Sequence, residues 1–101
     1  MSVLMTLRVS GDGTKLEELA AREPGLLQQI VDRAKEHGVI AHQFYGSETE
    51  VLVVDEWPDA ASFEAFFAAS PEIAGLMQEA GVTTEPEVTF WRKLDTKDSI
   101  G

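Results

Sequence analysis

One short apolar run, which leads through an acidic and aromatic corner into a helix, limits most strongly what this chain can fold into. Val51 to Val54 is apolar and mostly β-branched, which is typical of a strand buried on both faces. Trp57-Pro58-Asp59 follows, where Pro58 ends the strand and Asp59 is a favoured helix N-cap. The run therefore predicts a strand followed at once by a helix.

The first half of the chain predicts a strand and a helical region in two pieces. Val3 to Val9 alternates, so one face of a strand is apolar. Thr14 and Glu17 have the spacing of a capping box for the first helix. Pro24 interrupts this helix and starts a second piece, which Gly38 ends as a left-handed C-cap. The inward residues of the strand are expected at alternate positions: Val3, Met5, Leu7 and Val9.

Three more strands and a second helical region follow. The patterns predict strands over residues 39–45, 50–57 and 87–94, with a hairpin turn at 46–49. Asp59 caps the second helical region, and Ser70-Pro71-Glu72 stops and restarts it by the same cap-then-proline logic. Gly81 ends it. Its first piece buries Phe63, Phe66 and Phe67.

The element order is therefore β-α-β-β-α-β, the ferredoxin-like plan of the α+β class, with an antiparallel four-stranded sheet and both helical regions on one face. With 101 residues, the chain has room for one core, which we assign to a single domain at 1–95. Residues 96–101 are polar and are expected to be a flexible tail.

Charge and composition exclude several classes of protein. The net charge of −10 repels phosphate backbones and anionic membranes, so neither a nucleic-acid nor a membrane partner is expected. There are no cysteines and only two histidines, which are not adjacent, and this argues against a metal site. Residues 1–10 lack the features of a signal peptide, and we expect a cytoplasmic location.

The sheet face that the helices leave uncovered predicts a homodimer. In the third strand Val51 and Val53 point one way while Leu52 and Val54 point the other. Helices can cover only one of these two apolar faces. A second copy of the same sheet is the simplest cover for the other, since a self-complementary patch closes a dimer.

The chain at this point resembles the dimeric α/β-barrel proteins grouped around the antibiotic biosynthesis monooxygenases. The resemblance rests on the hairpin entered through Gly38, on Asp55-Glu56-Trp57 running into residues 59–66, and on the aromatic last strand at 88–92. It covers residues 3 to 94. It implies a homodimer whose two sheets form a barrel, with a small-molecule pocket between sheet and helices in each subunit.

The resemblance also implies an activity, and this chain departs from the family's residue pattern in the second helical region. Enzymes of the family include cofactor-independent monooxygenases of polycyclic phenols, haem-degrading enzymes and members with no known activity. Phe66 stands where such proteins often carry a histidine, and the position matched to the haem-binding histidine is apolar, near Leu76. Haem is therefore disfavoured, and we expect no cofactor.

His42 is the candidate general base. It lies in the second strand, and a histidine can take a proton from a phenol at neutral pH; the alternative is a hydrogen-bonded structural histidine. Asp55 and Glu56 are its candidate partners. Pairing Tyr45 with Glu50 would place His42 on the face of Asp55 and Trp57, whereas a shift of one residue would place it with Glu56.

Arginines and aromatic residues are the other candidates. Arg8 and Arg92 are expected on neighbouring strands, where either would hold a phenolate or carboxylate or pair with a strand acid such as Asp55 or Glu56. The aromatic side chains would either wall a pocket for a flat ligand or pack in the dimer core. We assign catalysis to His42, Asp55 and Arg92. The ligand-contacting set is Arg8, Tyr45, Trp57, Phe66 and Trp91.

Two functional classes remain open. In the first, a cofactor-free oxygenase, His42 or Asp55 deprotonates an electron-rich aromatic of the phenol, quinol or anthrone type, whose carbanion reacts with oxygen. In the second, the chain is a non-catalytic ligand-binding or structural dimer. A pocket filled by phenylalanines, with His42 turned to the dimer core, would count against the enzyme.

Overall fold

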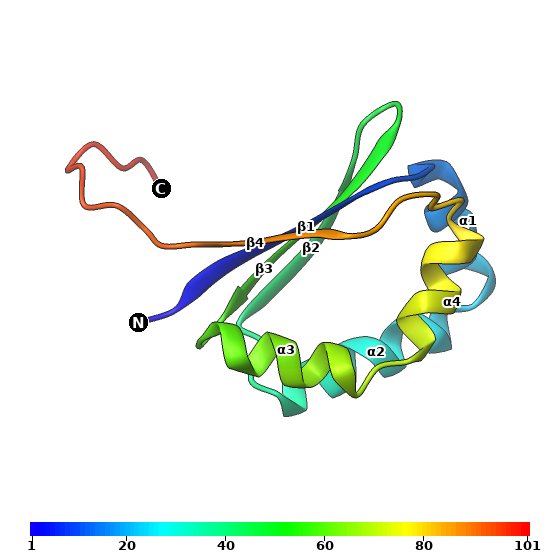
Figure 1. The fold of residues 1–101 in the computed structure, drawn as a ribbon, viewed down its shortest axis with the longest axis horizontal. Helices are drawn as coiled ribbons and strands as arrows, with labels where there is room; N and C mark the ends of the chain where they lie inside the picture. Colours follow the sequence, from blue (N-terminus) through cyan, green and yellow to red (C-terminus); the bar gives the residue numbers. More distant parts are fainter.

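The computed structural model describes all 101 residues and has one antiparallel sheet with every helix on the same side (Figure 1). The strands lie in the order β2-β3-β1-β4, which confirms the ferredoxin-like α+β prediction. Within one chain the sheet is open and does not close into a barrel. The elements are β1 (Val3–Ser10), α1 (Gly13–Arg22), α2 (Pro24–Glu36), β2 (Ala41–Gly46), β3 (Glu50–Trp57), α3 (Ala60–Ala68), α4 (Glu72–Glu79) and β4 (Glu87–Trp91).

The core lies between the inner sheet face and the helices. The alternation predicted for β1 is confirmed, since Met5, Leu7 and Val9 are buried. Val51 and Trp57 of β3 continue the same face, and Trp57 is completely buried. Hydrophobic burial contributes about 25 cal/mol per Å², so this layer is the main stabilising element. The helices contribute Leu16, Leu19, Ile30, Ala34, Phe63, Phe66, Leu76 and, just after α4, Ala80.

Two predicted helix starts are corrected in detail. The capping box of Thr14 and Glu17 was wrong, because α1 begins at Gly13 and Asp12 is its N-cap: the Thr14 amide donates to Asp12 Oδ1 at 2.9 Å. Ser70 does not cap α4; its hydroxyl donates to the Phe66 carbonyl at 2.8 Å instead. In both cases the hydrogen bond that forms differs from the one that the spacing indicated.

Strand boundaries are shifted by two or more residues at two places. β2 begins at Ala41 rather than residue 39, and β4 ends at Trp91 rather than residue 94. The shorter β4 leaves Arg92 outside the sheet. Its last pair with β1 joins Trp91 to Leu4, beyond which β1 has almost no residues left to pair with. None of the helices is long and apolar enough to cross a membrane.

Gly38 closes α2 as predicted, with φ of +93°, and gives the first testable result. A Cβ at this position would lie 3.3 Å from Pro58 Cγ. We expect Gly38→Ala to lose about 1–3 kcal/mol of unfolding free energy, because a side chain is strained at positive φ. Urea denaturation measures this. The control is Gly25→Ala, a helical position with no atom within 4 Å; equal losses in both variants would refute the assignment.

Asp59 caps α3 as predicted and gives a pH-dependent result. Its Oδ1 accepts hydrogen bonds from the Ser62 amide and hydroxyl, both at 2.8 Å, and these bonds lower the pKa of the Asp59 carboxyl. A pKa that is lower in the folded state adds stability above the ordinary aspartate pKa, and this stability is lost as pH falls through the folded value.

The variant that isolates this charge is Asp59→Asn, which keeps a capping oxygen without the ionisation. We expect wild type to have the higher Tm at pH 7 and the difference in Tm to shrink as pH falls toward 3. Thermal unfolding across that range is the measurement. A difference that stays constant with pH would rule out the charge as its source.

Candidate functional site

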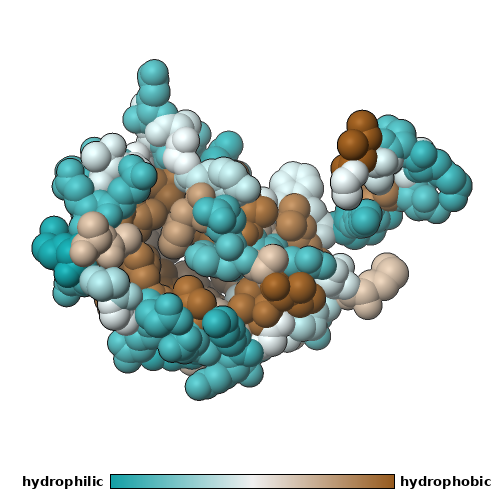
Figure 2. Space-filling model, turned by 180° about the vertical axis from the view of Figure 1, so that it is seen from behind, coloured by the Kyte–Doolittle hydropathy of each residue, from teal (hydrophilic) through white to brown (hydrophobic).

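A cavity of about 300 Å³ lies between the inner face of the sheet and the helices. Of the 22 residues that line it, 20 are hydrophobic, and the other two are His42 and Asp55. Figure 2 shows the hollow from behind, with hydrophobic residues on its wall. Convergent polar groups in an otherwise apolar pocket are the usual mark of a small-molecule site. The aromatic part of its lining is Phe44, Phe63, Phe66 and Phe67.

His42 and Asp55 are paired directly across β2 and β3. Their side chains are joined by a hydrogen bond of 2.7 Å between His42 Nδ1 and Asp55 Oδ1. A carboxylate can only accept, so Nδ1 carries the proton and donates it, and Nε2 is left as the free nitrogen of the neutral ring. The Asp55 side chain is 6% exposed and that of His42 is 30% exposed. The imidazole is thus fixed in one tautomer while still reachable from the cavity.

The register that brings this pair together differs from the ones considered in the sequence. Tyr45 pairs with Leu52 rather than Glu50, a shift of two residues. Because side chains alternate with a period of two, the shift keeps His42 on the face of Asp55 and Trp57. It also places His42 directly opposite Asp55. Glu56 pairs with Ala41 and points to the opposite face.

Trp57 holds the other oxygen of Asp55. Its indole Nε1 donates to Asp55 Oδ2 at 3.1 Å, and its ring packs edge-on against Phe63 with centroids 5.7 Å apart. Trp57 is not among the residues that line the cavity, although the sequence suggested a ligand contact. The structure gives it a supporting position, in which it orients the carboxylate that orients His42.

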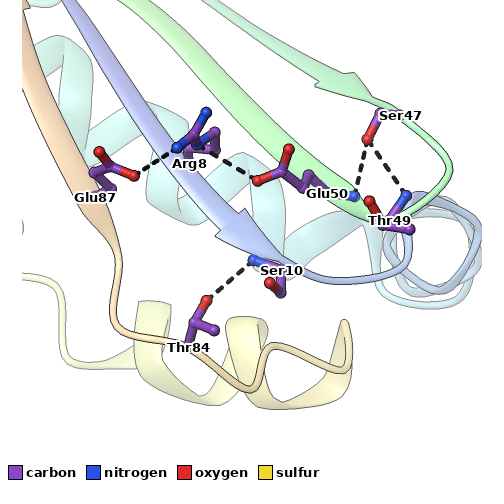
Figure 3. A network of polar contacts seen from close by, with 7 residues as sticks. All are labelled: Arg8, Ser10, Ser47, Thr49, Glu50, Thr84 and Glu87. Atoms are coloured by element: carbon purple, nitrogen blue, oxygen red, sulfur yellow. Dashed lines mark hydrogen bonds and ion pairs between the residues drawn. The ribbon is translucent and has the colours of Figure 1, made fainter.

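Arg8 lies on the outer face of the sheet, away from the cavity. Its guanidinium contacts Glu87 at 2.8 Å and Glu50 at 3.4 Å (Figure 3). The hydrogen bond to Glu87 raises the pKa of Arg8. An ion pair with a strand acid was one of the two expectations for Arg8. The expected partners were Asp55 or Glu56, whereas the observed ones are Glu50 and Glu87. Arg92 follows the end of β4, and neither arginine lines the cavity.

The remaining aromatic candidates divide between the two faces. Phe66 lines the cavity. Tyr45 and Trp91 point to the outer face and are 57% and 51% exposed, and Trp91 Nε1 donates to Thr6 Oγ1 at 2.9 Å. Leu76, near the position matched to a haem-binding histidine, also lines the cavity. The cavity thus brings together His42, Asp55 and Phe66 of the predicted residues.

The arrangement leaves one imidazole nitrogen, His42 Nε2, without a hydrogen-bond partner in the cavity lining. No group of three or more His, Cys, Asp or Glu side chains is placed to hold a metal ion. His42 Nε2 is able to take a proton from a ligand hydroxyl or acidic carbon, and Asp55 stabilises the imidazolium that results. The sequence did not predict that Trp57 would donate a hydrogen bond to Asp55, although the spacing of two residues puts both side chains on one strand face.

Solved structures with the same fold include two oxygenases. SnoaB, a cofactor-independent oxygenase from Streptomyces nogalater, matches with a TM-score of 0.62 and 13% identity, over 97% of this chain and 98% of that one. A monooxygenase from the gene ActVA-Orf6 of Streptomyces coelicolor, in complex with nanaomycin D, matches with a TM-score of 0.65 and 16% identity, over 94% and 89% of the two chains. These matches confirm the predicted resemblance at the level of the fold.

A third match bears on assembly. A dimeric ferredoxin-like protein from an uncultured marine organism has a TM-score of 0.64 and 11% identity, with 93% of this chain and 89% of that one covered. No protein-family model matches the sequence, and no curated protein matches it significantly. At these identities the similarity establishes the fold, and the chemistry has to be argued from the residues.

Proposed function

We propose that the protein binds a small aromatic compound in the cavity and that His42, oriented by Asp55, removes a proton from it as the first step of a cofactor-independent oxygenation. The observation that carries this proposal is the position of the only polar pair in an otherwise apolar cavity. Several solved structures with this fold are oxygenases by name, which supports the same class of reaction.

The proposed reaction is the conversion of an activated ring methylene to a carbonyl. His42 Nε2 takes the hydroxyl proton from the enol tautomer of the substrate, and the resulting delocalised anion, which is electron-rich at the former methylene carbon, gives electrons to O₂. One oxygen atom remains on the carbon as the carbonyl and the other leaves as water, so that CH₂ and O₂ become C=O and H₂O. The protein contributes the base, an apolar cavity and the orientation of the ring.

Binding without catalysis is the second candidate. It is favoured by the positions of Arg8 and Arg92, which do not line the cavity. An anion formed there would have His42 as its only side-chain donor, because Asp55, the other polar side chain in the lining, is a carboxylate that only accepts hydrogen bonds. The protonated imidazole of His42 would then be the only positive group that stabilises the anion after proton transfer.

Oxygen uptake separates the two candidates. Anthrone, which has an acidic ring methylene, is incubated with the protein in air-saturated buffer, and uptake is compared with the rate in buffer alone. The proposal expects uptake that rises with protein concentration and yields the carbonyl product. Tight binding of anthrone with uptake no faster than in buffer would leave the binding protein as the function.

We further propose a homodimer built on the outer sheet face. Leu4 and Trp91 are paired neighbours on that face and are 43% and 51% exposed, and Tyr45 on the same face is 57% exposed; neighbouring exposed apolar side chains are typical of an interface. One solved structure with this fold is described as dimeric. Light scattering is expected to give twice the 11.1 kDa of one chain, and Leu4→Glu is expected to shift the mass toward the monomer. A wild-type monomer at micromolar concentration would contradict this.

A further inference from the structure

The cavity offers a ligand very few hydrogen bonds. Of its lining side chains only those of His42 and Asp55 are polar. Both oxygens of Asp55 already accept hydrogen bonds, one from His42 and one from Trp57. His42 Nε2 is therefore the one polar side-chain atom in the lining that has no partner within the protein.

A ligand with several polar groups does not suit such a site. A hydroxyl that is buried without a partner loses its hydrogen bonds to water, and this weakens binding by roughly tenfold or more. His42 lies on β2, an edge strand of the sheet, while Phe66 and Leu76 of the lining come from the helices. The polar end of a ligand therefore belongs near β2, and its other end meets hydrocarbon.

Charge narrows the ligand further. No arginine or lysine lines the cavity, and the chain has a net charge of −10. A carboxylate or phosphate would enter next to Asp55 with no cation to pair with, which is costly in an apolar site. The ligand consequently has to bind in its uncharged form.

Shape favours a flat ring system. Phe44, Phe63, Phe66 and Phe67 all contribute to the wall, and phenylalanine rings pack well against an aromatic ligand through stacked and edge-on contacts. The volume of about 300 Å³ lies at the small end of the roughly 300–1,000 Å³ found for small-molecule pockets. This size suits a ligand of few rings.

We infer that the ligand is an uncharged, flat aromatic molecule with a single hydrogen-bonding oxygen at one end, which His42 Nε2 contacts, and hydrocarbon elsewhere. The inference rests on the proposed use of the cavity and narrows its substrate class from aromatic compounds in general to those with one polar group. A cavity of this kind therefore differs from one that binds rings with several hydroxyl groups.

Calorimetric titration of the full chain with four related probes tests the inference. The probes are 2-naphthol, naphthalene, 2,6-dihydroxynaphthalene and 2-naphthoate, which differ only in their polar groups. We expect 2-naphthol to bind most tightly, the distal second hydroxyl to weaken binding by roughly tenfold or more, and 2-naphthoate to bind weakest. In His42→Ala the advantage of 2-naphthol over naphthalene should disappear.

Three results would overturn the inference: equal or tighter binding of 2,6-dihydroxynaphthalene, preferred binding of 2-naphthoate, or no binding of any probe. The outcome is independent of catalysis. The expected order of affinities without oxygen uptake from anthrone would defeat the proposed function alone. Oxygen uptake with tightest binding of the dihydroxylated probe would defeat the inference alone.

Discussion

Replacement of His42 by glutamine is expected to slow oxygen uptake by about 10²–10⁴-fold, the usual contribution of a positioned general base. A glutamine side chain can still donate to Asp55, so the buried carboxylate keeps a partner. It cannot accept a proton at neutral pH. The loss should therefore appear in kcat, with KM and the urea midpoint close to those of wild type.

The chain contains a matched control for this variant. His37 is the only other histidine; it follows the C-terminal end of α2 and does not line the cavity. His37→Gln is expected to keep the wild-type rate of oxygen uptake. A similar loss in both variants, or an unchanged rate in His42→Gln, would remove His42 from the reaction.

Replacement of Asp55 by asparagine is expected to lower the rate by a similar factor, about 10²–10⁴, through the tautomer of His42. Asp55 now accepts from two donors, His42 Nδ1 and Trp57 Nε1. An asparagine amide has one oxygen and one NH₂ group, so it can accept from only one side of this pair. If the oxygen stays with Trp57, the NH₂ group donates to His42 Nδ1, and the proton moves to Nε2, which is then no longer a base.

The measurement for this variant combines a rate with a spectroscopic signature. Nitrogen NMR of labelled protein should show His42 protonated on Nδ1 in wild type and on Nε2 in Asp55→Asn. Glu56→Gln is the control, because Glu56 is the next acid along β3 and points to the outer face. An unchanged tautomer with a reduced rate would mean that Asp55 acts in some way other than by orienting His42.

The fold was predictable because its boundaries depend on local chemistry. Pro24, Gly38 and Gly81 each end or start an element for a backbone reason that holds in most surroundings. The start of α1 was harder, since Asp12 and Thr14 are both good N-cap residues and only the three-dimensional course of the turn selects between them. The end of β4 depends on how far β1 extends opposite it, which no local pattern reports.

The candidate site was predictable in part. The sequence indicates which residues of one strand share a face, but it does not indicate which residues of neighbouring strands are paired. Side chains alternate between the two faces, so every hairpin register that differs from the expected one by two residues keeps His42 on the face of Asp55. Arg8 could be placed on one strand face from its neighbours, but its partners Glu50 and Glu87 come from two other strands. Their meeting depends on the register of β1 with β3 and β4, which is fixed only by the assembled sheet.

Trp57 shows how burial changes the role of a residue. An aromatic side chain at the end of a strand is equally suited to a pocket wall and to a core. Here the ring is completely buried, and its only polar atom reaches Asp55 Oδ2. The indole therefore supports the acid rather than the ligand. A sequence gives no sign of this until the depth of the position is known.

His42 Nε2 is the group that we propose contacts the ligand inside the cavity. A crystal structure of the complex with 2-naphthol shows whether it does. We expect the naphthol oxygen at about 2.6–3.2 Å from Nε2, the range required for proton transfer, with the rings against Phe63 and Phe66 and the bond between His42 and Asp55 intact. A naphthol bound elsewhere, or one in the cavity with its hydroxyl turned away from His42, would contradict the account.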